Sequence, residues 1–401
     1  MTHQFITSAA HLQRFCQEIL TEPYIAFDTE FVSEHTYRSE LCLIQVAAGE
    51  HLAVIDPLAV RDIKPFWDAI VAPGHQTIVH AGREELNFCL QATGERPADL
   101  FDVQLAAGLV GNEYPAGYGA LLQRLLGISL EKGETRTDWR RRPLSRSQLE
   151  YALDDVRHLR AIRDILTEKL TSRGRLGWLT AEMEEWQAEV TEYRTREHWY
   201  KISGNTGLSR RSLAILRELW HWREGQAKML NQPARRVLRD DFLIELAKRR
   251  SADIKQIQAI RGLERSDYKR VLPEIADAIE RANSLPEGQL PVSQKRDLPQ
   301  QFTLLGQFLS AALSSICRSQ NVAMALVGTA TDVRDLIAYR LGYDSGEPPL
   351  LAQGWRAEVV GQIIEDLLSG ERCIRIVDPQ SDDPLRFDLL NKSPEEDSPP
   401  K

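Results

Sequence analysis

The sequence predicts an α/β domain followed by all-helical domains, and three observations lead to this fold class. Three short apolar runs, YIAFDTEF, LCLIQVA and HLAVIDP, lie close together near the N-terminus. A helical pattern (IKPFWDAIVA), a strand pattern (TIVH) and a second helical pattern (GREELNFCLQATG) then follow one another. This order is typical of a mixed sheet, part antiparallel and part parallel, flanked by helices. Residues 208–285 contain no convincing strand, which predicts a run of short helices there.

The α/β domain closes with further helical patterns. Apolar residues recur at helical spacing in LFDVQLAAGLVG, in YGALLQRLLG and from about Leu144 to Leu170. A connecting helix or linker follows over roughly residues 171–206, where AEMEEWQAEV is acidic and GNTG is a turn cluster. We therefore assign residues 1–200 to the first domain and its connecting helix.

The rest of the chain divides into three parts. Residues 207–290 have the size and pattern of a helical module that folds alone. After the Pro-rich LPEGQLPVSQKRDLPQ, residues 301–390 are mostly helical and end in CIRIVDPQSDDPLRFDLL, two β-like runs around a polar turn that suggest a hairpin. Residues 391–401 are polar and acidic, and we expect them to be disordered.

Length and composition exclude several classes of protein. A chain of 401 residues exceeds one hydrophobic core, and 42% apolar and 27% charged residues describe an ordinary globular protein. No apolar window of about 18 residues and no basic-then-apolar leader are present, so neither a membrane span nor a signal peptide is supported and we expect a cytoplasmic protein. The five cysteines show no C-x-x-C pairing, which argues against a zinc site or a disulfide framework.

The formal charge of −8 is unevenly distributed. Residues 1–200 carry −9, residues 201–290 carry +6 and residues 291–401 carry −5. A single basic segment indicates an anionic partner, although surface lysines and arginines also serve solubility. We expect the helical module to bind nucleic acid in a salt-sensitive manner.

Two carboxylates stand at the end of the first apolar run. Alternate residues of a strand point to one face, so Asp28 and Glu30 project side by side while Thr29 points away. Two like charges on one face require a cation or a raised pKa. The alternative is that the strand ends at Phe27 and both acids are solvated.

Two more acidic sites follow in the same domain. In YALDDVRHL, Tyr151 and Asp155 are i and i+4 on a predicted helix, which places a phenol and a carboxylate on one face. In HAGREEL, Glu84 and Glu85 fall in the first turn of a helix, where the helix dipole favours acids without any catalytic purpose. Each site is weak evidence alone, and their order along the chain is what adds weight.

That order, with the surrounding residues, resembles the ribonuclease D family of the DEDD exonuclease superfamily, in the subclass whose last motif carries a tyrosine. The resemblance covers about Phe5 to Leu290 and rests on AFDTEFVSEHTYRSELCLIQVA, LAVIDPL, VHAGREEL, FDVQLAAGLVG and ETRTDWRRRPLSRSQLEYALDDVRHL. The helical module, with QPARRVLRDDFLIELA, is similar to the HRDC domain of that family, and residues 301–371 are more loosely similar to its second helical repeat. The resemblance implies a ribonuclease H-like nuclease domain followed by HRDC-type helical domains.

The resemblance also implies the catalytic residues, which are Asp28, Glu30, Glu85, Tyr151 and Asp155. The four acids are the implied ligands of two divalent ions, Mg²⁺ or Mn²⁺. In this scheme Asp28 bridges the ions, Glu85 assists through water and Tyr151 orients the attacking water. The family usually has Asp where this chain has Glu85, so the site reads DEED, and the extra methylene displaces that carboxylate from the backbone.

Five further residues are candidates for binding the substrate. Similar positions in the family imply that Phe31, Tyr37 and Gln45 line the pocket of the terminal nucleotide, although core packing explains Phe31 equally well. Arg140 and Arg141 belong to the arginine-rich RTDWRRRPLSR, which either grips phosphates or is a solvated loop.

The implied function is that of a metal-dependent 3′-5′ exoribonuclease that releases nucleoside monophosphates from RNA 3′ ends, in the maturation of tRNA precursors or other stable RNA. Two alternatives stay open. The change at Glu85 is compatible with a catalytically weakened RNA-binding or scaffold protein. A DNA 3′-5′ exonuclease is the other alternative, because DEDD proofreading nucleases share the same acids. No membrane partner is expected.

Overall fold

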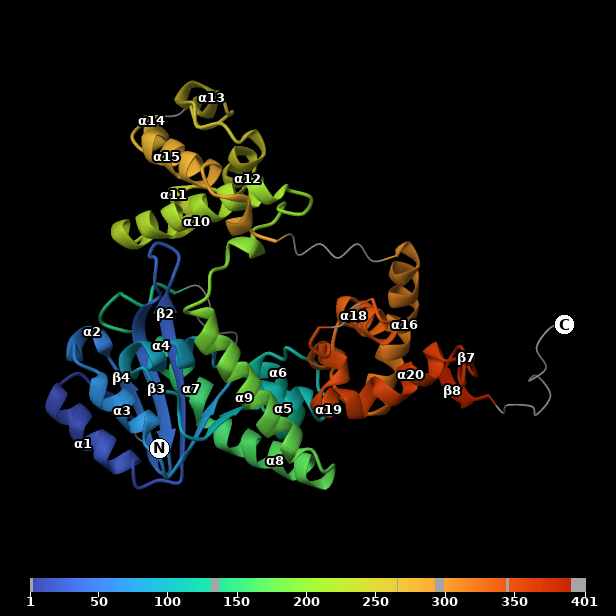
Figure 1. Cartoon of the computed structure of the whole chain (residues 1–401). Coiled ribbons are helices and arrows are strands. Elements are labelled where there is room, and N and C mark those ends of the chain that lie inside the picture. Colours follow the sequence, from blue (N-terminus) through green and yellow to red (C-terminus); the bar gives the residue numbers. More distant parts are fainter. Residues whose placement is uncertain (1–2, 131–136, 265, 293–298, 344–345, 391–401) are drawn as a thin grey trace.

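The computed structural model describes residues 3–130, 137–264, 266–292, 299–343 and 346–390 (Figure 1). Six strands form one mixed sheet in the order β1-β4-β3-β2-β5-β6. In chain order the strands are β1 (Gln4–Ile6), β2 (Tyr24–Val32), β3 (Glu40–Ala48), β4 (His51–Ile55), β5 (Gln76–Val79) and β6 (Leu100–Asp102). Strands β2, β3 and β4 are antiparallel neighbours, β1 runs parallel to β4, and β5 and β6 run parallel to β2. The predicted mixed α/β sheet is confirmed.

Helices cover both faces of this sheet. In chain order they are α1 (Ala9–Ile19), α2 (Pro57–Val60), α3 (Lys64–Val71), α4 (Arg83–Thr93), α5 (Val103–Gly108), α6 (Tyr118–Leu126), α7 (Arg146–Arg157), α8 (Leu159–Ser172) and α9 (Leu176–Tyr193). Phe27 of β2 packs edge-on against Phe66 and Trp67 of α3, with ring centroids 5.6 and 5.9 Å away. Because side chains alternate along a strand, Asp28 points to the other face, where α7 contacts β2, β3 and β4.

Three local features differ from the sequence patterns. Strand β1 was absent from the predicted elements, and its three residues pair with β4 residue by residue. The helical prediction for LFDVQLAAGLVG is wrong for its first three residues, which form β6 because they pair with β5. The long run from Leu144 to Leu170 divides into α7 and α8 at His158, whose backbone (φ −110°, ψ 0°) leaves the helical region.

The helical module has a hydrophobic core of its own. Its helices are α10 (Arg210–Leu230), α11 (Ala234–Val237), α12 (Asp240–Arg249), α13 (Ile254–Gln258), α14 (Ser266–Lys269) and α15 (Leu272–Asn283), flanked by the 3₁₀ turns η1 (Trp199–Lys201) and η2 (Glu287–Gln289). Leu216 and Leu219 of α10 pack with Leu243 of α12 and with Ile275 and Ile279 of α15, all fully buried. The core of the module is separate from that of the sheet.

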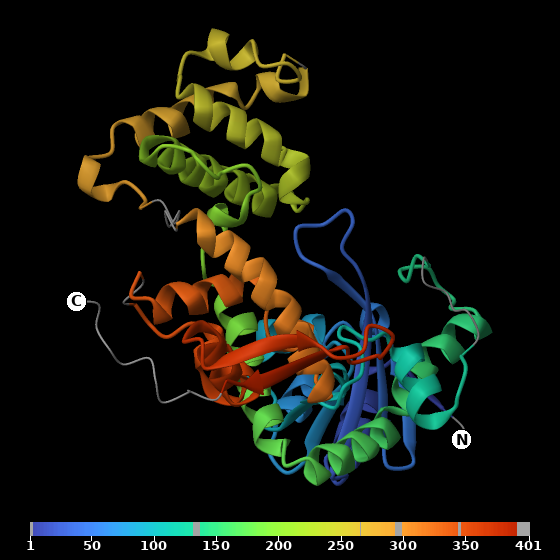
Figure 2. The ribbon, with the colours of Figure 1, turned by 90° about the vertical axis from the view of Figure 1, so that its right-hand side faces the viewer.

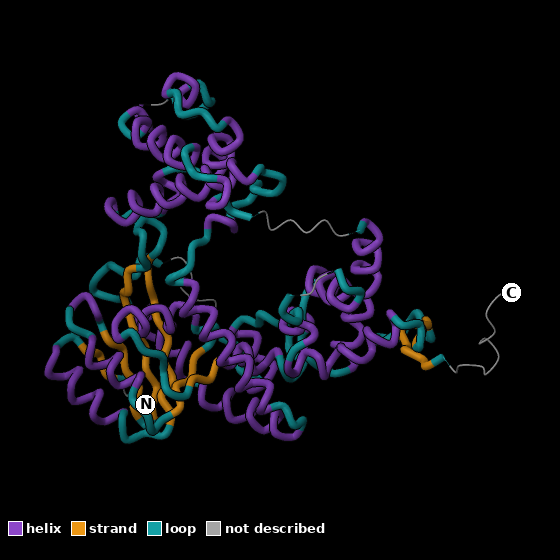
Figure 3. The backbone as a smooth tube through the Cα atoms, in the orientation of Figure 1, coloured by secondary structure: helices purple, strands orange, loops and turns teal. Residues whose placement is uncertain are grey.

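The C-terminal region instead shares its core with the sheet domain. It contains α16 (Gln300–Ser319), α17 (Met324–Val327), η3 (Leu350–Ala352), α18 (Ala330–Arg340), α19 (Gly354–Arg356), the π-helical η4 (Ala357–Gly361) and α20 (Gln362–Leu368). Strands β7 (Arg372–Ile376) and β8 (Leu385–Leu389) then form an antiparallel hairpin, the second place where strands occur in Figure 3. In both ribbon views this region lies against α5 and α9, whereas the helical module stands apart from the sheet (Figures 1 and 2).

Polar contacts reinforce this shared core. The amide of Ala323 donates a 2.8 Å hydrogen bond to the carbonyl of Gly108, which joins the start of α17 to α5. Arg356 forms a buried ion pair with Glu182 of α9 at 2.8 Å, and Trp355 stacks on Trp178 at 5.2 Å. Within the described part of the chain, no helix has the length and apolar character needed to cross a bilayer. The tail expected to be disordered, residues 391–401, lies outside the described residues.

Candidate active site

The end of β2 forms one wall of the candidate site. β2 pairs with β3 from Ala26 to Val32, but its recorded pairing with β5 stops at Ala26. The last residues of β2 therefore have a sheet partner on one edge, while helices approach from both faces. The register also shifts between Glu30 and Phe31, an irregularity that breaks the alternation immediately after the second carboxylate.

The second wall is α7, whose start is fixed by a capping box. The Ser145 hydroxyl accepts from the amide of Gln148, and the Gln148 side chain accepts from the amide of Ser145. The helix packs across β2, β3 and β4, so Tyr151 and Asp155 face the strand that carries Asp28. The predicted helix and its i, i+4 pair are therefore placed against the predicted strand.

The turn before α4 forms the third wall. Ala81 has a positive φ of 53°, and a Cβ on Gly82 would lie 2.4 Å from the side chain of Val79, so the chain can approach β5 closely only with glycine there. The buried carboxylate of Asp102 accepts hydrogen bonds from the amides of Ala81 and Gly82, at 3.2 and 2.9 Å. It also accepts from the amide of Gln104 at 2.7 Å, which caps α5. Asp102 thus joins two strand-to-helix turns and fixes the start of α4, the helix that carries Glu85.

All four site acids have raised pKa values, and neighbouring site acids contribute to those of Asp28 and Glu30. Burial raises the pKa of Asp28 well above its usual value, and the charges of Glu85, Asp155 and Glu30 raise it further. Burial, then Asp155 and Glu85, raise the pKa of Glu30 to about 8. Burial and the charge of Asp154 raise the pKa of Asp155 to about 7. The structure therefore brings carboxylates from β2, α4 and α7 into one electrostatic cluster.

Glu85 is held by a residue of β2. Its Oε1 accepts a 2.5 Å hydrogen bond from the Thr29 hydroxyl, and both side chains are 5% exposed. Burial raises the pKa of Glu85 to about 7, although the Thr29 hydrogen bond opposes this effect. Because side chains alternate along a strand, Thr29 points to the face of β2 opposite to Asp28 and Glu30. Glu85 therefore contacts β2 from the face on which α4 lies.

Tyr151 is supported by an indole ring. Trp139 is 5% exposed and stacks on Tyr151 with the ring centroids 6.2 Å apart and the planes 29° apart. Burial, together with the charges of Asp155, Glu30 and Asp28, raises the pKa of Tyr151 above its usual value. The phenol therefore stays protonated and can donate a hydrogen bond near neutral pH.

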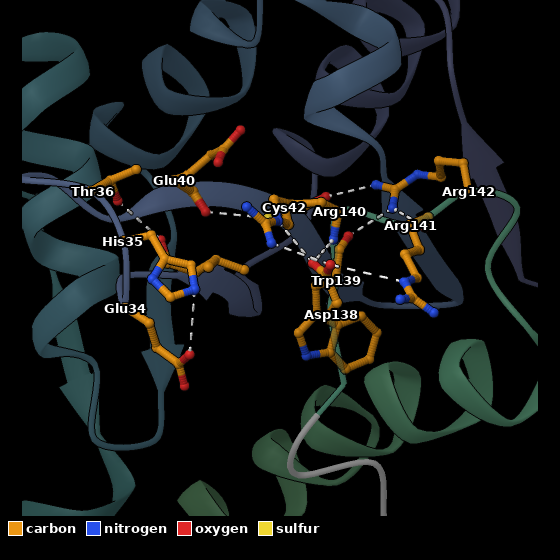
Figure 4. Close-up of polar contacts among 11 residues, drawn as sticks. Glu34, His35, Thr36, Glu40, Cys42, Asp138, Trp139, Arg140, Arg141 and Arg142 are labelled. Carbon is orange, nitrogen blue, oxygen red and sulfur yellow. Dashed lines mark hydrogen bonds and ion pairs between the residues drawn. The ribbon is translucent and has the colours of Figure 1, made fainter. Parts of the chain in front are cut away.

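The arginine-rich segment has two different roles (Figure 4). Arg142 forms a two-pronged ion pair with the buried Asp56, at 2.6 and 2.8 Å, and donates to the carbonyl oxygens of Cys42 and Trp139 at 2.9 and 2.7 Å. Arg140 and Arg141, the predicted phosphate contacts, instead lie around Asp138, at 2.8 and 3.9 Å. Arg136 of the same segment lies outside the described residues.

The other predicted substrate contacts lie in three different surroundings. The ring of Phe31 is 5.8 Å from that of Phe88 on α4, which is the packing alternative for this residue. The Tyr37 hydroxyl donates to Glu224 of the helical module at 2.8 Å, away from the acids. Gln45 lies opposite Asp28 on β3, is fully buried, and neither polar atom of its side chain has a partner among the described residues. Of these three residues, Gln45 is the one placed directly beside a site carboxylate.

The chemistry of the acids fits divalent cations. Within the described residues no three His, Cys, Asp or Glu side chains are already gathered closely enough to hold a metal ion. The fit rests on the donor set instead, because hard carboxylate oxygens are the ligands of Mg²⁺ and Mn²⁺. A cation would also offset the repulsion that raises the pKa of Asp28 and Glu30.

The sequence reasoning missed four residues that build the site: Thr29, Asp56, Asp102 and Trp139. Asp102 had a detectable signal, since an acid after an apolar run and before a helix is a typical N-cap. Asp56 precedes Pro57 at the start of α2 and has the same signal. The contacts of Thr29 and Trp139 join segments far apart in the chain and leave no local pattern.

Comparison with known proteins places the chain in a family. Residues 3–171 match the model of a 3′-5′ exonuclease family, and residues 212–279 match that of the HRDC domain. The chain is 35% identical over 376 residues to ribonuclease D of Gluconacetobacter diazotrophicus, covering 92% of this chain and 94% of that protein. It is 34% identical over 382 residues to ribonuclease D of Granulibacter bethesdensis, with the same two coverages.

A solved structure extends the similarity to the whole fold. The crystal structure of Escherichia coli RNase D, described as an exoribonuclease involved in structured RNA processing, superposes with a TM-score of 0.81. It is 28% identical in sequence, and the match covers 92% of this chain and 99% of that one. The similarity therefore includes the sheet domain, the HRDC domain and the C-terminal helical region together. The chain belongs to the ribonuclease D family and is a 3′-5′ exoribonuclease.

Proposed function

We propose that this exoribonuclease releases nucleoside monophosphates one at a time from the 3′ ends of tRNA precursors or other stable RNA, with two divalent ions in its active site. The observation that supports the proposal is that Glu85 of α4 and Asp155 of α7 raise the pKa of the buried Asp28 and Glu30 of β2, so that three separate elements contribute carboxylates to one place. Buried acids that raise one another's pKa are stabilised as anions when cations bind between them.

The residues of the site have distinct proposed roles. Asp28, Glu30 and Asp155 would hold one ion, and Asp28 and Glu85 would contribute to holding a second, Glu85 through water. The chemistry that two such ions supply is activation of the attacking water and stabilisation of the leaving oxygen. The carboxylates on β2 and α7 would hold the ions in a fixed position, because α7 packs directly against β2.

Tyr151 would orient the attacking water and would not act as a base. Its pKa is raised by burial and by the nearby acids, so it keeps its proton at neutral pH. A protonated phenol donates one hydrogen bond, and the stacked Trp139 limits the directions in which it can do so. Replacing Tyr151 with Phe should therefore lower kcat while leaving KM for RNA nearly unchanged.

The test uses purified protein and single-stranded RNA labelled at its 5′ end. With Mg²⁺ or Mn²⁺ we expect nucleoside monophosphates and a ladder of shortened RNA, and Asp28→Ala should abolish both. Hydrolysis that persists after complete chelation of divalent ions would overturn the two-ion proposal. A set of tRNA precursors with 3′ extensions, compared with unstructured RNA of equal length, tests the substrate class.

Glu85 is proposed to be a working variant of the usual Asp. The hydrogen bond from Thr29 supports this, because it holds the longer side chain in a defined position. Glu85→Asp should then change activity by less than about tenfold. A much larger gain would instead indicate that the parent protein is a weakened nuclease. Matched RNA and DNA 3′ ends, measured side by side, decide whether DNA is also hydrolysed.

A further inference from the structure

A groove separates the HRDC module from the nuclease domain. Its volume is about 960 Å³, and it is lined by residues 37–39 of the β2–β3 loop, by the outer side of α4, by residues 193–202 and by α10 to α12. These segments meet where the β2–β3 loop rises toward α10 in Figure 1. Glu84, on the groove, directly precedes Glu85 of the active site. One part of the groove therefore lies at the same helical turn that carries Glu85.

The free charge of the groove is positive. Of the described residues that line it, seven are Arg or Lys and four are Asp or Glu. The acids are mostly bound already: Ser39 and Asn87 donate to Glu84, at 3.3 and 3.1 Å, and Tyr37 donates to Glu224. Asp240 pairs with the buried Arg223 at 2.7 Å. Arg196 and Arg235 are also paired with acids, Glu192 and Asp240. Among the described residues of the groove, the cations without a carboxylate partner are therefore Arg38, Arg194, Lys201 and Lys228.

Two of these cations, Arg38 in the β2–β3 loop and Arg194 directly after α9, line the groove and are both exposed. Neither forms an ion pair with a carboxylate of the described residues, although Arg194 donates to the carbonyl of Asn87 at 2.9 Å. Burial lowers the pKa of Arg194, and so does the charge of Arg38, the other cation of the same groove. Two guanidinium groups that line one groove without an ion-paired acid suit a phosphate, because each can donate two parallel hydrogen bonds.

Aromatic rings stand beside the cations. Tyr193 is 42% exposed, with the Lys201 ammonium 4.8 Å from its ring centroid. The Lys228 ammonium lies 5.9 Å from the ring centroid of Tyr37. One face of Tyr193 is already covered by His198, whose ring centroid is 3.7 Å away. The cations beside these rings suit the backbone of unpaired nucleotides, which is bound without reading the sequence.

We propose that this groove binds the unpaired RNA segment upstream of the 3′-terminal nucleotide, with Arg38 and Arg194 holding its phosphates. The inference rests on the proposed function, since the RNA end must lie at the acids for the next nucleotides to enter the groove. Its volume of about 960 Å³ lies in the range of small-ligand sites, about 300 to 1,000 Å³, which is of the size of a few unpaired nucleotides. A partner protein fits less well, because its docking surface would need an apolar centre.

The experiment compares RNA that reaches the groove with RNA that does not. Binding of labelled RNA of about 12 and about three nucleotides is measured over a range of salt, in the full chain carrying Asp28→Asn to prevent hydrolysis. The groove variant is Arg38→Gln with Arg194→Gln. The matched control, Arg14→Gln with Arg96→Gln, removes two exposed arginines of the nuclease domain that do not line the groove. Arg38→Lys with Arg194→Lys restores both charges.

We expect the groove variant to bind the longer RNA about tenfold more weakly and to reduce the slope of log Kd against log salt by about 1.4, the value for two lost phosphate contacts. Its affinity for the short RNA should change by less than about twofold, and the lysine variant should recover the salt slope. Equal losses in the control and groove variants, or an unchanged salt slope, overturn the proposal. If the parent protein hydrolyses neither RNA while the groove variant still loses affinity for the longer one, the proposed function fails and the groove stands.

Discussion

Glu85 shows how one residue can depend on a neighbour that no sequence pattern connects to it. Spacing alone placed Asp28 with Glu30 and Tyr151 with Asp155, because strand and helix periods decide which side chains share a face. The 2.5 Å hydrogen bond between Thr29 and Glu85 joins residues 56 positions apart, so it follows from tertiary packing alone. Gln45 is similar, since its place opposite Asp28 depends on the register between β2 and β3.

The Thr29 hydrogen bond leads to a first prediction. Thr29→Val keeps the shape of the side chain and leaves the buried Glu85 carboxylate without its donor, which costs about 1.5 to 3 kcal/mol for a charged group. We expect kcat to fall about tenfold or more and the Mn²⁺ concentration for half-maximal activity to rise. Direct Mn²⁺ binding, followed by electron paramagnetic resonance, should weaken in parallel, and Thr29→Ser should restore both. Equal behaviour of the Val and Ser variants would contradict this role.

Gln45 leads to a second prediction. A buried amide with neither polar atom paired destabilises the fold, and Gln45→Met fills the same space without that cost. We expect the free energy of unfolding to rise by about 1 to 2 kcal/mol, measured by urea titration without divalent ions. If Gln45 contacts the terminal nucleotide, the same variant should lose activity. A drop in stability would mean that the amide has partners, such as water.

At the level of elements, the sequence predicted the main strands and the helices on their faces, because apolar runs and helical spacing are local signals. It did not predict β1 or β6, whose three residues each are strands only because a longer neighbour pairs with them. It also singled out Arg140 and Arg141 as phosphate contacts and gave no role to Arg142. Arg142 differs from Arg140 and Arg141 because Asp56 lies beside it in space, 86 positions away in the chain.

The Asp56–Arg142 pair gives a third prediction. Arg142→Met leaves Asp56 buried and unpaired and frees the carbonyl of Trp139, which packs on Tyr151. We expect a loss of about 2 to 4 kcal/mol in the free energy of unfolding, the range for breaking a mostly buried pair. Activity should also fall, because Tyr151 loses its support. The matched control is Arg140→Met, whose exposed pair with Asp138 should matter little to stability; similar losses in both variants would contradict a special role for Arg142.

At the level of the whole molecule, the two helical regions differ in whether they have a hydrophobic core of their own. The HRDC module has its own core, whereas the C-terminal region completes the core of the nuclease domain through α16 to α20. Sequence patterns indicated both regions as helical, but they could not reveal this difference. It depends on which apolar faces meet across more than a hundred residues, as Trp178 and Trp355 do.

Truncation provides a fourth prediction. Ending the chain after residue 292 exposes the apolar surface of α5 and α9 that the C-terminal region covers. It also leaves the Glu182 carboxylate without its partner Arg356. We expect the truncated protein to melt at a clearly lower temperature and to aggregate at concentrations where the full chain is monodisperse. Residues 199–292, made separately, should unfold cooperatively by themselves, since they include the whole described core of the module. A truncated nuclease domain with unchanged stability would show that the shared core is marginal.

The docking of the C-terminal region has one more consequence, for the position of the HRDC module. The module is attached at both ends, through α9 on one side and through α16 on the other, and both helices belong to the same core. A domain that is linked at both ends explores a smaller volume than a domain linked at one end. The effective concentration of its groove-lining face at the active site is therefore higher. The C-terminal hundred residues therefore act as an anchor that sets how often the two walls of the groove meet.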